Sequence, residues 1–447
     1  MNKPDSASLD SNKLAARLNA DCLCTSLDRS ALRRELERMA DGAALANMIE
    51  EDRPCLLSDT TVYVSSAHIK RMSEIIAAIE RVIALPAYQS YVLTYAPEIA
   101  CHVTGANGVF FGYDFHIGKA GPQLIEINTN AGGGLLNTLV ARAHQVSCEC
   151  CKDVPTVLPC TLAPAHPEHL FIEMFRQEWR TRFEPERSRP LSTVAIVDLA
   201  PEQQYLYPEF LLFRQLFERH GVAAFVCDPT ELAWHDNALW YGSYQIDLVY
   251  NRLTDFALEA PSSISLRQAY LADGAVITPH PRVHALYADK RNLVALSDDA
   301  MLIQWGVDAA TRSLLKSGIP RTELIKPEQA EEFWRHRRQL FFKPATGYGS
   351  KAAYRGDKLT RRIFDEIMAN AKNYVAQALV PPSTRRLEIN GGTSEFKIDL
   401  RNYAYVGSVQ LVAARLWQGQ TTNFRSSGGG FSPVIAVTGE ANCKDVS

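Results

Sequence analysis

The sequence predicts a mixed α/β fold built from several packed units, and three observations support this. From Thr193 onward, buried strand patterns alternate with amphipathic helix patterns, which is typical of an α/β layer with a parallel sheet. Residues 65–87 carry apolar side chains at helical spacing, with Ser65 or Ser66 as the expected N-cap. Residues 112–128 predict two strands joined by a turn, and a glycine cluster follows them. At 447 residues the chain is long enough for two or three such units.

The hairpin predicted at residues 112–128 carries the most informative polar side chains. Strand alternation places Glu126 and Asn128 on one face, and a turn at Ala120-Gly121-Pro122 would bring Asp114 to that face too. Two carboxylates and an amide oxygen are hard ligands, suited to Mg²⁺ held jointly with nucleotide phosphates. The alternative is a hairpin with a few polar residues on its solvent-exposed face. The spacing alone leaves these two interpretations equal.

Composition narrows the class of protein. A net charge of −3 and a pI near 6.4 argue against a nucleic-acid partner. The sequence shows neither a secretory signal nor a run of about 18 apolar residues, so we expect no membrane span. The ten cysteines are dispersed, which favours reduced thiols in a cytoplasmic protein. Cys148, Cys150 and Cys151 form a cluster without paired CxxC spacing, so burial is favoured there over a metal or redox role.

The unit that begins at Thr193 resembles a nucleotide-binding layer but lacks its phosphate loop. Its first strand is followed by LAPEQQYL, with no GxGxxG pattern. A dinucleotide-binding role is therefore disfavoured, and we assign this unit to the substrate side of the protein or to its scaffold.

Candidate phosphate-binding residues lie further along the chain. Lys343 ends the apolar strand LFFKP, and a loop containing Gly347 and Gly349 follows it. Successive backbone N–H groups in a glycine-containing loop can bind phosphate, although this loop is not a Walker A motif. Lys290 offers a second cation at the start of a helix, and the strand around Gln377 could supply backbone groups to an adenine edge. Taken singly, the glycine loop favours a plain hairpin turn, and each lysine favours a solvated charge.

The C-terminal strands add arginines to this set. Asp399 and Arg401 share one strand face, Arg415 lies near the end of the next strand, and Asn423 and Arg425 follow in a glycine-rich segment. Arginine suits planar recognition of carboxylate and phosphate, although a surface salt bridge is the commoner role of any single arginine.

In their joint order these motifs resemble the ATP-grasp superfamily, in particular glutathione synthetases and other carboxylate–amine ligases. The resemblance covers most of residues 65–140 and 193–437. The elements that should close the chain, a helix, a strand with an Asp and a strand ending in Glu-x-Asn, stand instead near its front. The resemblance therefore implies a circularly permuted ATP-grasp fold with a Rossmann-like domain before the nucleotide-binding part.

The resemblance also implies a division of the chain into parts. These are a helical segment (1–60), the permuted core with the metal hairpin (61–150), a connector (151–192), the pre-ATP-grasp domain (193–285), the nucleotide lid subdomain (286–380) and the remaining core strands (381–447).

The resemblance assigns roles residue by residue. Mg²⁺ or Mn²⁺ would be held by Asp114, Glu126 and Asn128. The residues implied at ATP are Lys290, Lys343, Gly347, Tyr348, Gly349, Ser350, Gln377, Leu379, Asp399 and Asn423. The substrate carboxylate and the forming acyl-phosphate would be held by Arg401, Arg415 and Arg425. Some ligases carry an arginine two residues before the metal Asp, where this chain has Gly112, so Arg401 or Arg415 would replace it.

The implied reaction joins a small carboxylate to an amine through an acyl-phosphate, releasing ADP and phosphate. The implied partners are amino-acid or peptide-like small molecules, whose identity the sequence does not give, and homo-oligomerisation is left open. Two other interpretations stand beside this one, a kinase-like nucleotide enzyme that needs no amine and a non-catalytic relative.

Overall fold

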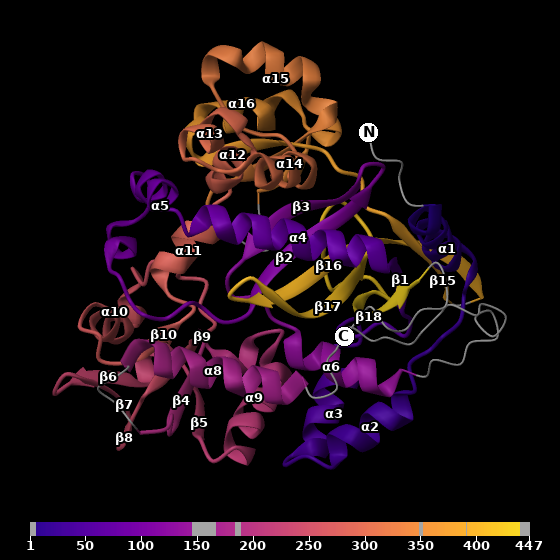
Figure 1. The fold of residues 1–447 in the computed structure, drawn as a ribbon. Helices are drawn as coiled ribbons and strands as arrows, with labels where there is room; N and C mark the ends of the chain where they lie inside the picture. Colours follow the sequence, from indigo (N-terminus) through magenta and orange to yellow (C-terminus); the bar gives the residue numbers. More distant parts are fainter. Residues whose placement is uncertain (1–5, 145–166, 184–188, 348–351, 390, 439–447) are drawn as a thin grey trace.

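A large sheet of seven strands, almost all antiparallel, forms the centre of the computed structural model, which describes residues 6–144, 167–183, 189–347, 352–389 and 391–438 (Figure 1). Only its first two strands pair in parallel, and β15 (Thr384–Ile389) pairs with β16 beyond the main path. The order along that path is β1 (Val62–Ser65), β18 (Gly430–Val437), β17 (Ser408–Trp417), β16 (Gly392–Tyr405), β2 (Phe111–Gly118) and β3 (Gly121–Asn128).

The hairpin from the front of the chain thus pairs directly with a strand almost 290 residues later. In the register, Asp114 lies opposite Arg401 on β16 and opposite Glu126 on β3. The pairing of β2 with β3 is the one that the predicted hairpin requires, because it brings Asp114 to the face that carries Glu126. The pairing of β2 with β16 joins the motif-bearing strands from the two halves of the chain in one sheet.

Helices cover this sheet. The predicted helix at 65–87 is confirmed as α4 (Ser66–Ile83), and Ser65 caps it by accepting a hydrogen bond from the His68 N–H at 3.2 Å. Its apolar side chains pack on the strands in one buried cluster. The remaining helices of the first half are α1 (Ser6–Asp21), α2 (Arg29–Glu37), α3 (Gly42–Glu50), α5 (Pro86–Leu93) and α6 (Gly134–Ala143).

A second sheet of four parallel strands lies beside the large sheet and carries its own helices (Figure 1). Its order is β10 (Val276–Thr278), β9 (Leu248–Asn251), β4 (Thr193–Val197) and β5 (Ala223–Cys227). The helices are α8 (Pro167–Phe183), α9 (Tyr207–Arg219) and α10 (Ile264–Leu271), and a small antiparallel sheet is added by β6 (Leu232–His235), β7 (Ala238–Tyr241) and β8 (Tyr244–Gln245). The parallel layer predicted from Thr193 onward is therefore present.

A third, small sheet forms a separate lobe at the top of Figure 1. Its strands are β11 (Thr322–Leu324), β14 (Tyr374–Ala378), β12 (Leu340–Pro344) and β13 (Tyr354–Arg355). Two helices cover it, α15 (Ala330–His336) and α16 (Arg361–Ala369). The chain enters this lobe through α11 (Pro281–Tyr287), α12 (Arg291–Ser297), α13 (Asp299–Gln304) and α14 (Ala309–Gly318).

The N-terminal segment is mostly helical, as predicted, and it is fastened to the large sheet. Arg385 on β15 is fully buried and donates to the backbone oxygens of Thr61 at 3.0 Å and Asn19 at 3.1 Å. Asn19 in turn bonds the backbone of Tyr63 on β1. In the part of the chain that the structure describes, no helix is both long enough and apolar enough to cross a membrane.

Candidate active site

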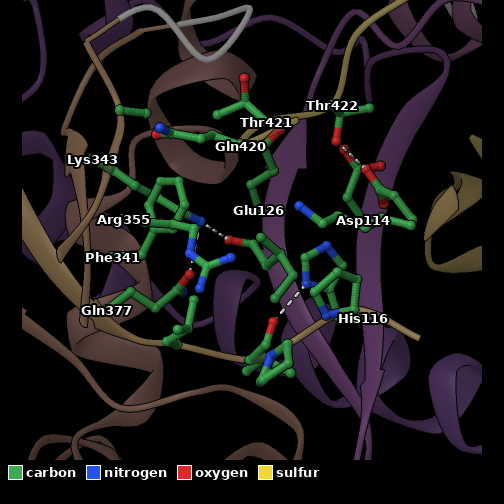
Figure 2. Close-up of a pocket in the computed structure, with 18 of the residues that line it drawn as sticks. Asp114, His116, Glu126, Phe341, Lys343, Arg355, Gln377, Gln420, Thr421 and Thr422 are labelled. Carbon is green, nitrogen blue, oxygen red and sulfur yellow. Dashed lines mark hydrogen bonds between the residues drawn. The ribbon is translucent and has the colours of Figure 1, made fainter. Parts of the chain in front are cut away.

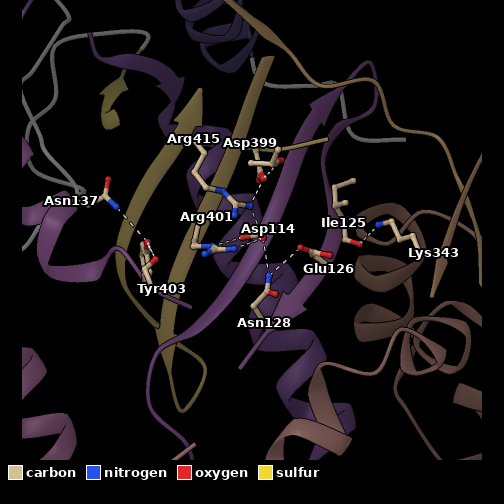
Figure 3. Close-up of polar contacts among 12 residues, drawn as sticks. Asp114, Ile125, Glu126, Asn128, Asn137, Lys343, Asp399, Arg401, Tyr403 and Arg415 are labelled. Atoms are coloured by element: carbon tan, nitrogen blue, oxygen red, sulfur yellow. Dashed lines mark hydrogen bonds and ion pairs between the residues drawn. The ribbon is translucent and has the colours of Figure 1, made fainter. Parts of the chain in front are cut away.

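The three predicted metal ligands come together on the hairpin. Asp114 and Glu126 are cross-strand partners, and Asn128 lies on the same face of β3. The Asn128 Nδ2 group donates to Asp114 Oδ2 at 2.9 Å and to Glu126 Oε1 at 3.3 Å (Figure 3). The juxtaposition expected from strand alternation is therefore present.

Asp114 lies at the centre of a buried ionic network. Arg401 binds it with both ends of its guanidinium group, Nε to Oδ1 at 2.7 Å and Nη2 to Oδ2 at 2.7 Å. Arg415 adds a contact from Nη2 to Oδ2 at 2.8 Å and also bonds Asp399, its cross-strand partner. The side chains of Asp114 and Arg401 are 1% and 8% exposed. Burial raises the pKa of Asp114, while the two guanidinium groups act against that shift.

This network decides how a divalent cation would fit. A carboxylate offers about two acceptor positions on each oxygen. Asp114 Oδ2 accepts three N–H groups, from Arg401, Arg415 and Asn128, and Oδ1 accepts one, from Arg401. Glu126 keeps free acceptor capacity, since the one hydrogen bond described for it comes from Asn128. Within the described ranges, no group of three or more His, Cys, Asp or Glu side chains gathers in a way that could hold a metal ion. The chemistry of Glu126 suits such a cation, but the surroundings of Asp114 do not.

Two buried lysines face Glu126. Lys343 Nζ donates to the Ile125 backbone oxygen at 2.9 Å and to Gln377 Oε1 at 2.8 Å, so it links the small sheet to the hairpin (Figure 3). Lys290 Nζ donates to the Gly347 backbone oxygen at 3.0 Å. Burial, with a contribution from Lys290, lowers the pKa of Lys343 to about 8. Burial acts to raise the pKa of Glu126, but the positive charges of Lys290, Lys343 and Arg415 bring it down to about 2.

These groups line a cavity of about 260 Å³ between the small sheet and the large sheet. Figure 2 shows Lys343 and Gln377 on one side of it and Asp114 and His116 on the other. The apolar part of the wall contains Ile125, Phe341, Pro344, Leu379, Val380 and Trp417. The wall thus combines an apolar surface with buried charged groups, which is the character of a site for a flat ring joined to an anion.

The structure brings only some of the predicted residues to this cavity. Lys290, Lys343, Gly347, Gln377, Leu379 and Asp399 line it together with the hairpin carboxylates. Arg401 and Arg415 reach it through Asp114, whereas Asn423 and Arg425 are not among the lining residues. Asn423 instead closes its own loop, donating to the Gln418 and Thr421 backbone oxygens. Tyr348, Gly349 and Ser350, like the cysteines at 148–151, lie outside the described residues.

The adenine contact of β14 and Leu379 stays a prediction, and some of the groups there are already hydrogen-bonded. The Gln377 side chain points to Lys343 and Thr322. The Leu379 N–H donates to the Gln339 backbone oxygen at 2.8 Å, so this donor is already used. Sequence spacing could not show this, because it does not reveal which strands flank β14.

Three site residues were missed by the sequence analysis. His116 lines the cavity and donates from Nδ1 to the Val380 backbone oxygen at 2.8 Å; burial lowers its pKa. Its place two residues after Asp114 was a usable signal, because alternate strand residues share a face. Thr421 and Thr422 also line the cavity, and Thr422 Oγ1 donates to Asp399 Oδ2 at 3.2 Å. No comparable spacing signal exists for these loop residues.

Comparisons with known proteins place the fold. Neither the protein-family models nor the curated proteins compared with this chain match it. Among solved structures, a glutathione synthetase-like effector from Globodera pallida in its apo form aligns with a TM-score of 0.54 at 11% identity, covering 85% of this chain and 90% of that one. A D-alanyl-alanine synthetase A from Vibrio cholerae aligns with a TM-score of 0.27 at 12% identity, covering 48% of this chain and 68% of that one. A D-cycloserine synthetase gives 0.28 at 16% identity, with coverages of 55% and 92%.

The likeness to the effector shows a shared fold. At 11% identity it supports no statement about activity or ligands. The α/β fold of the ATP-grasp type, expected from the order of the motifs, is confirmed. The circular permutation and the Rossmann-like nature of the parallel layer stay predictions.

Proposed function

We propose that the protein is an ATP-dependent ligase that joins a small carboxylate to an amine through an acyl-phosphate, with ADP and phosphate as the other products. The observation that carries this proposal is the pair of buried lysines opposite Glu126 in a cavity whose wall also contains many apolar side chains. Buried cations beside a carboxylate that stays ionised suit the phosphates of a nucleotide better than a neutral ligand.

In this proposal the residues of the chain bind and orient, and none is required as a general acid or base. Lys290 and Lys343 bind the phosphates, and the apolar wall holds the base. Glu126 and Asn128 hold the Mg²⁺ or Mn²⁺ that accompanies ATP, a cation that neutralises charge on the phosphates when bound. Arg401 and Arg415 supply fixed positive charge where the substrate carboxylate becomes an acyl-phosphate. Positioning and charge neutralisation of this kind account for most of the catalysis in phosphoryl transfer.

The test is ADP release from ATP and Mg²⁺ across a panel of amino acids, short peptides and amines. We expect release that requires both a carboxylate and an amine, and a product with a new amide bond. Lys343→Ala and Glu126→Ala should each lower the rate by at least about 100-fold. Lys326→Ala, at an exposed position outside the cavity, is the matched control and should leave the rate unchanged.

Two other outcomes would point elsewhere. ADP release that needs a carboxylate but no amine would identify a kinase-like enzyme. Nucleotide binding without release for any substrate pair would identify a non-catalytic relative. Unchanged turnover in both Lys343→Ala and Glu126→Ala would contradict the site itself.

A further inference from the structure

The space beside Gly112 is filled by Arg401. Gly112 lies on the same face of β2 as Asp114, two residues earlier. A Cβ atom at Gly112 would lie 2.6 Å from the Ala131 Cβ and 3.0 Å from the Arg401 Nε. Real Cβ atoms do not approach other atoms as closely as the first of these distances, so a side chain at position 112 would have to displace its neighbours. The absence of a side chain there is what lets the Arg401 guanidinium reach Asp114.

Arg401 in turn takes up acceptor positions on the Asp114 carboxylate. Its bidentate contact takes one acceptor position on each carboxylate oxygen, and Oδ1 has no other partner among the described residues. Oδ2 also receives Arg415 and Asn128. Charge-assisted bidentate pairs of this kind are the strong ones, and this one is almost fully buried. A cation that used Asp114 would have to bind Oδ1 beside the Arg401 guanidinium, whose positive charge opposes it.

Glu126 stands in contrast to Asp114. It is partly exposed, it lines the cavity, and the hydrogen bond described for it is a long one of 3.3 Å from Asn128. The positive charges near it belong to Lys290, Lys343 and Arg415, and none of these groups is hydrogen-bonded to its oxygens in the described part of the chain. Of the two hairpin carboxylates, Glu126 therefore presents the larger free acceptor capacity to the cavity, and no described guanidinium is hydrogen-bonded to it.

We propose that Arg401 is a positioning residue that withholds Asp114 from the divalent cation, so that Glu126 is the one carboxylate of the hairpin that the protein offers to it. Gly112 is the residue that admits Arg401 to this place. This rests on the proposed nucleotide function and deepens it. With a single carboxylate the nucleotide-free protein binds the cation weakly, because affinity rises with the number of charged ligands. The cation then arrives mainly with the nucleotide, whose phosphates supply most of its ligands.

The test is Mn²⁺ binding to the nucleotide-free protein, followed by electron paramagnetic resonance of the free ion. Arg401→Met frees Asp114 Oδ1, and we expect Mn²⁺ to bind at least about tenfold more tightly than to the wild type. Asp114→Asn should lower the wild-type affinity less than Glu126→Gln does, because it removes a nearby charge but no ligand, and it should abolish the gain when combined with Arg401→Met. Glu126→Gln should weaken binding in both backgrounds. Arg386→Met, an exposed arginine on β15, is the matched control.

Two results would overturn the inference. One is an unchanged Mn²⁺ affinity in folded Arg401→Met, and the other is a loss of affinity in Asp114→Asn as large as that in Glu126→Gln. If Arg401→Met does not fold, Arg401→Lys decides the question, because a single ammonium keeps the charge but cannot bond both oxygens of Asp114, and it should give the same direction of gain. These measurements need no nucleotide and no turnover. A failed inference therefore leaves ADP release in the wild type intact, whereas a failed proposed function is seen as its absence.

Discussion

Arg385 and Arg401 are both buried arginines of the large sheet, but their guanidinium groups meet opposite surroundings. Arg385 is bonded to backbone oxygens, including those of Thr61 and Asn19, and to the Thr60 hydroxyl. Arg401 is bonded to the carboxylate of Asp114, and its neighbours Arg415 and Asp399 keep buried atoms without a hydrogen bond, Nε and Oδ1. The first environment is neutral and well satisfied, whereas the second is charged and incompletely satisfied.

The difference separates a structural arginine from site arginines. Backbone oxygens that lose a buried donor have no other partner, so Arg385 holds the N-terminal segment to the sheet. Unsatisfied buried groups cost stability and are kept where function needs them. On this view the Arg385 cluster should control folding, and the groups around Asp114 and Lys343 should control ligand binding.

The largest expected effect tests the structural side. Arg385→Met removes the donors to the N-terminal segment, and we expect the free energy of unfolding to fall by about 3 kcal/mol. Denaturant unfolding measures this, and Arg386→Met, next in sequence but exposed, should change it by less than about 0.5 kcal/mol. Equal effects of the two variants would remove the contrast between the two regions.

The next effect tests the site. Lys343→Met should weaken nucleotide binding by about 100-fold, measured by calorimetry, because it removes a buried cation from the cavity. It also removes the donor to the Ile125 backbone oxygen and to Gln377 Oε1, so the free energy of unfolding should fall by about 1 to 2 kcal/mol, less than in Arg385→Met. Lys358→Met, exposed on the same lobe, should change neither quantity. Nucleotide binding that is unchanged in Lys343→Met would mean that this lysine is structural, like Arg385.

A smaller effect follows from pH. Lys343 has a pKa of about 8 in the folded protein against an ordinary value of 10.5, so its charge is present at pH 7 and lost as the pH rises through 8. Nucleotide affinity should fall about tenfold between pH 7 and pH 9. Over the window from about 8 to 10.5 the unfolded chain binds more protons at this group, so its contribution to stability rises with pH. Lys343→Arg should flatten the binding profile, and a wild-type profile that is already flat would contradict the assignment.

Whether a feature of these two regions could be predicted from the sequence depends on how far apart its residues lie along the chain. The hairpin, the cap at Ser65 and the lysine at the end of its strand follow from local patterns, and the structure confirms these elements. The contact between Arg401 and Asp114 joins residues 287 positions apart, and the Arg385–Asn19 contact joins residues 366 apart. Such contacts depend on which strands become neighbours and in which register, and no local period encodes that. The sequence therefore predicted the carboxylates of the site but not the ion pairs that Asp114 makes with Arg401 and Arg415.

The smallest effect tests whether Arg385 alone, or Arg385 together with Ser65, attaches the N-terminal segment to the large sheet. Ser65 caps α4 and also donates to the Asn12 side chain on α1, so it joins the N-terminal segment to the core at a second point. Ser65→Ala should lower the free energy of unfolding by about 1 kcal/mol, the usual cost of a lost cap. Ser73→Ala, in the middle of the same helix, is the control. Combined with Arg385→Met, the two losses should add if the contacts act independently, and a smaller sum would show that Arg385 alone holds α1 in place.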